Sequence, residues 1–148
     1  MCIVSQSFFW AWSAKASSGT APSPYDLNME FHGAGTVVTG ASGGIGEALA
    51  RRFHLLGAFV VVSDVVEAGI TALAAELNAK RPNSALAVTA DVSTESGNQQ
   101  LVATSRQFLS QDGRNGIDLF FANAGVGNGT LIETTSESDW NLAFNVNV

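Results

Sequence analysis

The sequence has one cysteine, Cys2, and two histidines, His32 and His54. A single thiol cannot form an intramolecular disulfide, and neither histidine has a second His or Cys at metal-ligand spacing, so we assign no metal site. Positive charge is also scarce, because 7 Lys and Arg oppose 13 Asp and Glu, for a net charge of -6. This balance argues against a nucleic-acid partner and against an anionic membrane surface.

Residues 1–30 differ in composition from the rest of the chain. Their apolar run, 8–12, is too short to span a membrane, and no basic residue precedes it as in a secretory signal. Residues 17–24 are rich in Ser, Gly and Pro, which is typical of a flexible linker. We expect a disordered leader over 1–30, with a targeting segment as the alternative. Residues 31–148 are expected to form one domain, and the protein is expected to be cytoplasmic.

A glycine-rich motif, TGASGGIG at 39–46, follows the apolar run 36–38 and precedes a segment of helical period. Gly40 would let the chain leave a strand in a tight turn, Gly44 would let the backbone approach a pyrophosphate, and Gly46 would let the helix pack close to the sheet. The N–H groups at the start of that helix would bind a phosphate without a basic side chain. The predicted phosphate-binding residues are Gly40, Ser42, Gly44, Ile45 and Gly46.

Asp64 ends the next apolar run at the separation expected of the residue that binds an adenosine ribose. Its carboxylate would accept hydrogen bonds from the 2′- and 3′-hydroxyls of NAD and would repel a 2′-phosphate. Neither Val65 nor Gly43 supplies a compensating cation. If the chain binds a dinucleotide, we therefore expect NAD rather than NADP.

Together with three later motifs, these residues resemble the short-chain dehydrogenase/reductase family from about Phe31 to Val148. The later motifs are Asp91-Val92, Asn123-Ala124-Gly125 and the segment from Trp140 to Asn147. The resemblance implies hydride transfer between a nicotinamide cofactor and an alcohol or carbonyl substrate. It also implies a homo-oligomer for a full-length form.

The resemblance also gives these later motifs roles. Asp91 and Val92 would contact the adenine ring, although Asp91 alternatively serves as an acidic residue at a helix start. Asn123, Ala124 and Gly125 would stabilise the sheet beside the cofactor. Asn147, seven residues after Trp140, would be the catalytic-tetrad Asn that holds a water in a proton relay, or alternatively would fray at the end of the chain.

Short apolar runs near 35–39, 58–63, 85–90 and 117–122 alternate with segments of helical period, which predicts βαβ units. Right-handed crossovers and the resemblance predict an incomplete Rossmann-type doubly wound parallel sheet of about four strands, in the order 3-2-1-4. In the second crossover, an apolar stripe is expected at Val66, Ile70, Leu73 and Leu77.

The family's chemistry needs a Ser and a Tyr-x-x-x-Lys pair, in which the Lys lowers the pKa of the Tyr. Tyr25 is the only tyrosine, residue 29 is Met, and both precede the first strand. We therefore expect the cofactor-binding half of an oxidoreductase, without its catalytic half. The alternative is a non-catalytic dinucleotide-binding or regulatory module. A methyltransferase fits less well, because the Asn-Ala-Gly motif has no role in it.

Overall fold

The computed structural model describes residues 31–127, 129 and 131–147. Its strands are β1 (Gly35–Thr39), β2 (Phe59–Asp64), β3 (Ala85–Thr89) and β4 (Leu119–Phe121). Its α-helices are α2 (Gly44–Leu55), α3 (Glu67–Lys80), α4 (Glu95–Leu109) and α5 (Glu137–Asn147), and two 3-10 turns are η1 (Gln111–Gly113) and η2 (Ile132–Thr134). The expected leader, with Cys2 and Tyr25, lies outside the described residues. No helix within them is long and apolar enough to cross a membrane.

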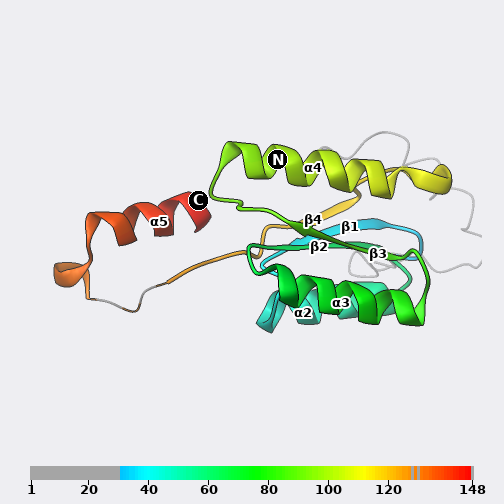
Figure 1. The fold of residues 1–148 in the computed structure, drawn as a ribbon, viewed down its shortest axis with the longest axis horizontal. Helices are drawn as coiled ribbons and strands as arrows, with labels where there is room; N and C mark the ends of the chain where they lie inside the picture. Colours follow the sequence, from blue (N-terminus) through cyan, green and yellow to red (C-terminus); the bar gives the residue numbers. More distant parts are fainter. Residues whose placement is uncertain (1–30, 128, 130, 148) are drawn as a thin grey trace, which may run out of the picture.

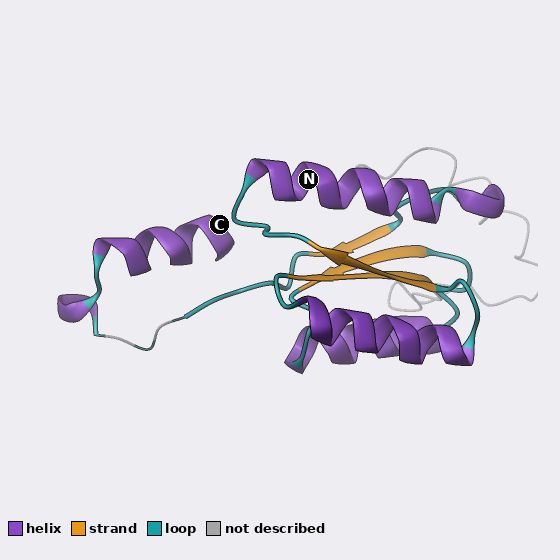
Figure 2. Cartoon of the chain, in the orientation of Figure 1, coloured by secondary structure: helices purple, strands orange, loops and turns teal. Residues whose placement is uncertain are grey.

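The four strands form one parallel sheet in the order β3-β2-β1-β4, which confirms the predicted topology. Val37 of β1 is in register with Val61 of β2 on one side and with Phe120 of β4 on the other. Helices α2 and α3 cover one face of the sheet and α4 covers the other, whereas α5 lies beyond the sheet at the end of an extended segment (Figures 1 and 2).

Alternate residues of the central strands supply two hydrophobic cores. Val60 and Val62 pack with α2 and α3, whereas Val61 faces α4, and all three side chains are fully buried. Burying one such side chain stabilises the fold by about 1.5–3 kcal/mol. This burial on both faces explains why β2 reads as a continuous apolar run rather than an alternating one.

The stripe expected on the second crossover is correct at Ile70, Leu73 and Leu77 but wrong at Val66. Val66 precedes the first turn of α3 and is 54% exposed, and Ala74 joins the buried face instead. The chain leaves β2 at Asp64, so Val66 belongs to a turn in which helical spacing has no meaning.

Strand β4 is shorter than the predicted run, and Asp118, just before it, binds the start of β1. The Asp118 carboxylate accepts a hydrogen bond from the N–H of Gly35 at 2.8 Å, and its own N–H donates to the Gly35 carbonyl. Among the described strands β4 pairs only with β1, and Phe120 remains 44% exposed.

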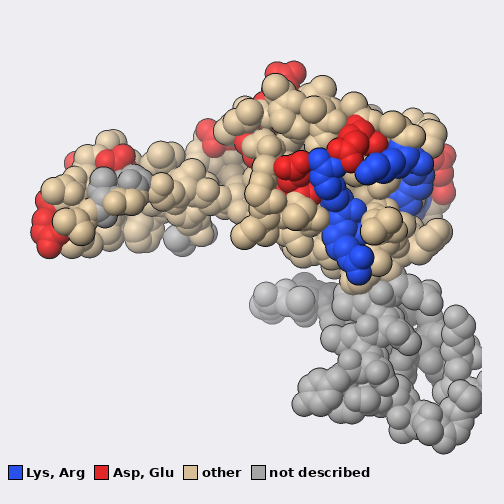
Figure 3. All heavy atoms as spheres, turned by 90° about the horizontal axis from the view of Figure 1, so that it is seen from below, with Lys and Arg blue, Asp and Glu red and all other residues tan. Residues whose placement is uncertain are grey.

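Basic and acidic side chains lie next to one another on the outer face of α2 and α3 (Figure 3). Arg51 binds Glu47 on its own helix and Glu76 on α3, and Lys80 reaches the same Glu76 at 2.7 Å. These two cations lower the pKa of Glu76 to about 2. Arg51 thus joins two helices, which agrees with a surface charge rather than a ligand.

His54 lies at the end of α2 and is buried. Its Nε2 is 2.7 Å from the hydroxyl of Ser84, which donates to the carbonyl of Arg81. The imidazole is therefore the donor in the His54–Ser84 bond. Burial, with the charges of Arg81 and Lys80, lowers the pKa of His54.

Candidate functional site

The residues singled out by sequence gather at the carboxyl ends of the parallel strands. The glycine-rich segment follows β1, Asp64 ends β2, Asp91 follows β3 and Asn123 follows β4. In open parallel sheets this edge is where ligands bind, beside the point where the strand order reverses. The strand that leads into the glycine-rich segment, β1, lies between β2 and β4 at that reversal.

Three positions of the segment require glycine, for two different structural reasons. A Cβ on Gly46 would lie 2.2 Å from the Gly40 carbonyl oxygen, and a Cβ on Gly40 would lie 2.8 Å from the Cα of Ala124. These two positions are fixed by close packing. Gly44 instead has a left-handed backbone, φ +55°, with no atom of the described residues within 4 Å of a built Cβ. The loop surface at Gly44 is therefore open, at the first residue of α2.

The carboxylate of Asp64 joins the glycine-rich loop to the turn after β2. One of its oxygens accepts from the N–H of Ser42 at 3.1 Å, and the other accepts from the N–H of Val66 at 3.0 Å. Burial raises the pKa of Asp64, but the hydrogen bonds from Val66 and Ser42 outweigh it and leave the pKa below its ordinary value. Asp64 is therefore ionised at neutral pH.

The carboxylate of Asp91 caps the turn that precedes α4. Its Oδ1 accepts from the hydroxyl and the N–H of Ser93, at 2.7 and 2.9 Å, and these bonds lower the pKa of Asp91. The N-cap of α4 itself is Thr94, whose side chain accepts from the N–H of Gly97, and the acidic residue in the first turn is Glu95. The adenine role of Asp91 stays a prediction. A shallow cavity of about 360 Å³ opens beside it, between Val65 and the first turns of α4.

Asn123 and Thr39 tie the end of β4 to the glycine-rich loop. The Asn123 amide donates to the carbonyls of Thr39 and Gly40, at 3.0 and 3.3 Å. The Thr39 hydroxyl accepts from the N–H groups of Asn123 and Ala124, at 3.1 and 3.0 Å. Thr39 escapes prediction from the sequence, because a threonine that ends a strand has no distinctive spacing. Its only signal is its place at the start of the motif.

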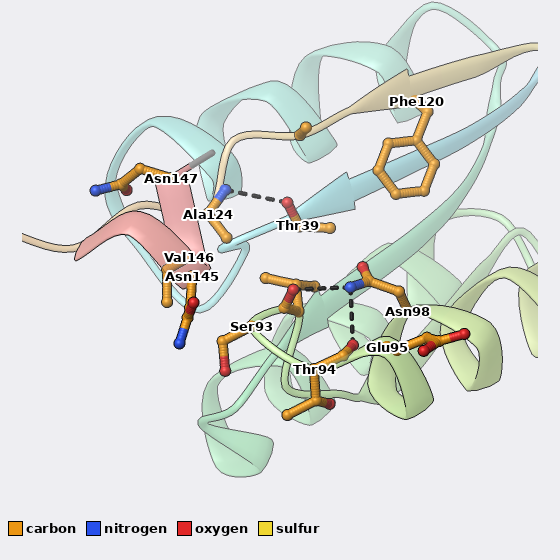
Figure 4. Close-up of a pocket in the computed structure, with 12 residues that line it drawn as sticks. Thr39, Ser93, Thr94, Glu95, Asn98, Phe120, Ala124, Asn145, Val146 and Asn147 are labelled. Carbon is orange, nitrogen blue, oxygen red and sulfur yellow. Dashed lines mark hydrogen bonds between the residues drawn. The ribbon is translucent and has the colours of Figure 1, made fainter. Parts of the chain in front are cut away.

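The side chain of Asn147 pairs with the backbone of a single residue. Its Oδ1 accepts from the N–H of Val126 at 3.0 Å and its Nδ2 donates to the carbonyl of Val126 at 2.9 Å. These two bonds join the exposed side chain of Asn147 to Val126. A cavity of about 310 Å³ separates the end of α5 from the start of α4, with Thr39 and Phe120 among the residues that line it (Figure 4).

Comparisons with known proteins agree with this architecture. The family model of short chain dehydrogenases matches residues 35–148. The meso-2,3-butanediol dehydrogenase of Serratia marcescens is 34% identical over 120 residues, which cover 81% of this chain and 45% of that protein.

Two solved structures also match. A short chain dehydrogenase/reductase of Burkholderia phymatum, in complex with NAD, has a TM-score of 0.73 at 34% identity and aligns with 80% of this chain and 40% of that one. The 3-ketoacyl-(acyl-carrier-protein) reductase of Brucella melitensis, complexed with NADH, has a TM-score of 0.71 at 31% identity and aligns with 80% of this chain and 46% of that one.

The chain spans less than half the length of each of these three relatives. Its strand order, its glycine-rich turn and the match over 35–148 agree with one another. On these grounds, the chain belongs to the short-chain dehydrogenase/reductase family.

Proposed function

We propose that the chain is the cofactor-binding part of an NAD(H)-dependent oxidoreductase that transfers hydride between the nicotinamide and an alcohol or carbonyl substrate. The observation that carries the proposal is the glycine-rich loop, whose open Gly44 stands at the first turn of α2 and whose Ser42 is bound to Asp64. When bound, the cofactor supplies the hydride chemistry, and the residues of this chain hold and orient it.

The loop offers an anion site that fits a pyrophosphate. The first N–H groups of an α-helix have no partner within the helix, and the helix dipole favours negative charge there. Chain neighbours apart, no described atom lies within 4 Å of a Cβ built on Gly43 or Gly44, and Gly44 is exposed, so there is space for a phosphate beside the backbone. The pyrophosphate would contact this loop through Gly40, Ser42, Gly44, Ile45 and Gly46.

The remaining parts of the dinucleotide would lie along the same edge of the sheet. Asp64 would bind the adenosine ribose, and Asp91 with Val92 would bind the adenine. Asn123, Ala124 and Gly125 would support the loop beside the cofactor, for which the Asn123 bonds to the Thr39 and Gly40 carbonyls provide the means. Asn147, held by Val126, would take part in the proton relay of the longer enzyme.

The ionised Asp64 favours NAD over NADP. A 2′-phosphate would stand next to this carboxylate, and the adjacent Val65 and Ser42 carry no positive charge to offset the repulsion. The relatives in complex with NAD and NADH support the same cofactor class.

Isothermal titration of the 148-residue chain with NAD⁺ and NADP⁺ tests the proposal. We expect saturable binding of NAD⁺ and weaker binding of NADP⁺. In Asp64→Ala, the ratio of the two Kd values should be smaller. The control Glu133→Ala removes an exposed carboxylate that lies in η2 and is not among the predicted site residues. Equal or tighter binding of NADP⁺ would contradict the NAD preference. Absence of binding of both dinucleotides would contradict the proposed function.

A non-catalytic dinucleotide-binding module is the second candidate, because the 148 residues contain no Tyr-x-x-x-Lys. The genomic sequence downstream of Val148 separates the two candidates. An in-frame Ser and Tyr-x-x-x-Lys would favour the oxidoreductase, and a stop codon in mature transcripts directly after Val148 would favour the module.

A further inference from the structure

Gly69, in the first turn of α3, lies against the glycine-rich loop although it is distant from that loop in sequence. A Cβ built on Gly69 would meet Ser42 Cβ at 2.8 Å, Ser42 O at 3.1 Å and Ser42 Cα at 3.2 Å. All three of its nearest neighbours therefore belong to one residue of the loop. A separation below 3.0 Å is too short for two carbon atoms that are not bonded. A side chain at position 69 would therefore displace either Ser42 or α3.

The helix is held more firmly than the loop at this contact. Ile70, directly after Gly69, is fully buried, and Leu73 and Leu77 anchor the following turns in the core. Ser42 is half-buried in the loop, and its N–H donates to the Asp64 carboxylate at 3.1 Å. A collision between the two elements would therefore move Ser42 rather than α3.

We infer that Gly69 is a positioning residue for the dinucleotide. Together with Asp64, it sets the position of Ser42 and thereby the direction in which the loop residues after Ser42 present their backbone N–H groups. Asp64 holds Ser42 from the β2 side, and the bare Cα of Gly69 leaves the space that Ser42 occupies on the α3 side. This inference rests on the proposed function, because it assigns a role in binding the same cofactor.

The substitution Gly69→Ala tests the inference in the 148-residue chain, with NAD⁺ as the titrant. Alanine is the better helix former, so the substitution favours the folding of α3 while it pushes Ser42 away. We expect the Kd for NAD⁺ to rise about tenfold, the size of one charge-assisted hydrogen bond. The control Thr71→Ala raises helix propensity at an exposed position of α3 and should bind NAD⁺ as the parent chain does.

A double-mutant cycle with Ser42→Gly separates positioning from a general effect on the fold. Ser42→Gly removes the Cβ that alanine at position 69 would meet, so Gly69→Ala should cost much less affinity in that background than in the parent chain. Hydrogen exchange of the cofactor-free chain gives a second readout: Gly69→Ala should speed exchange of the Ser42 N–H without affecting the N–H groups in the middle of α3.

An equal loss of affinity in both backgrounds, or unchanged binding by Gly69→Ala, would overturn the inference and leave the proposed function intact. Absence of NAD⁺ binding by the parent chain would overturn both.

Discussion

Gly46 is the point at which α2 approaches the glycine-rich loop most closely. In Gly46→Ala, the new Cβ would lie 2.2 Å from the Gly40 carbonyl oxygen and 2.7 Å from the Asn123 amide nitrogen. The nearest atom is backbone, and the amide is bound to the carbonyls of Thr39 and Gly40, so neither yields easily. Overpacking of this kind costs about 3 kcal/mol at the upper end of its usual range.

Helix propensity opposes part of this cost. Alanine in a helix is favoured over glycine by about 1 kcal/mol, so the net loss of unfolding free energy is about 2 kcal/mol. For a domain of this size the loss corresponds to a decrease in Tm of about 8 °C.

Thermal unfolding followed by circular dichroism measures this effect, with Gly43→Ala as the matched control. Gly43 has an extended backbone, φ 178°, and no described atom lies within 4 Å of a Cβ built there. Gly43→Ala should melt close to the parent chain. If Gly46→Ala melts no lower than Gly43→Ala, close packing at Gly46 does not hold α2 against the loop and the reasoning is refuted.

Three further predictions concern acid stability, association and turnover. Burial, and then the charges of Arg81 and Lys80, lower the pKa of His54, whereas Glu76 raises it. As the pH falls, His54 is therefore protonated in the unfolded chain before it is protonated in the folded one. The free energy of unfolding should decrease as the pH drops below about 6.5. Urea unfolding between pH 7.5 and 5.5 should show this slope, and a slope that persists in His54→Gln would contradict its origin. One edge of β4 pairs with no other described strand, and Phe120, Trp140 and Phe144 are half-exposed, so the 148-residue chain should self-associate. Phe120→Ser should reduce this association in sedimentation velocity; a monodisperse parent chain would contradict the prediction. Without Tyr-x-x-x-Lys, the chain should give no alcohol- or carbonyl-dependent change in NADH absorbance; turnover that is abolished by Gly44→Trp would reveal a catalytic group in this chain.

The sequence predicts the sheet well, because its signals are local and periodic. Each strand is a short apolar run, and β2 is apolar without interruption since both of its faces are buried. The motif predicts a tight turn at Gly40 and close packing at Gly46, and the structure has a left-handed φ of +65° at Gly40 and a close approach to the Gly40 carbonyl at Gly46. The order of the strands follows from the handedness of the crossovers and from the family resemblance.

Contacts between distant segments are what the sequence does not reveal. Thr39 receives two backbone N–H groups from residues 123 and 124, and Gly69 accommodates Ser42, but neither residue has a spacing that indicates its partner. On α5, the rings of Trp140 and Phe144 stack at 4.9 Å. Asn147 pairs with Val126, 21 residues earlier in the sequence, and no periodic pattern indicates this pairing.

The central claim is that a dinucleotide binds on the backbone of the glycine-rich loop. Amide NMR of the ¹⁵N-labelled 148-residue chain, titrated with NAD⁺, tests it most directly because each N–H group reports separately. We predict that the largest shifts occur at Ser42, Gly44, Ile45 and Gly46, with smaller ones around Asp64, and that Asp64→Ala weakens the response. Shifts confined to other parts of the chain, or none at saturating NAD⁺, would contradict the claim.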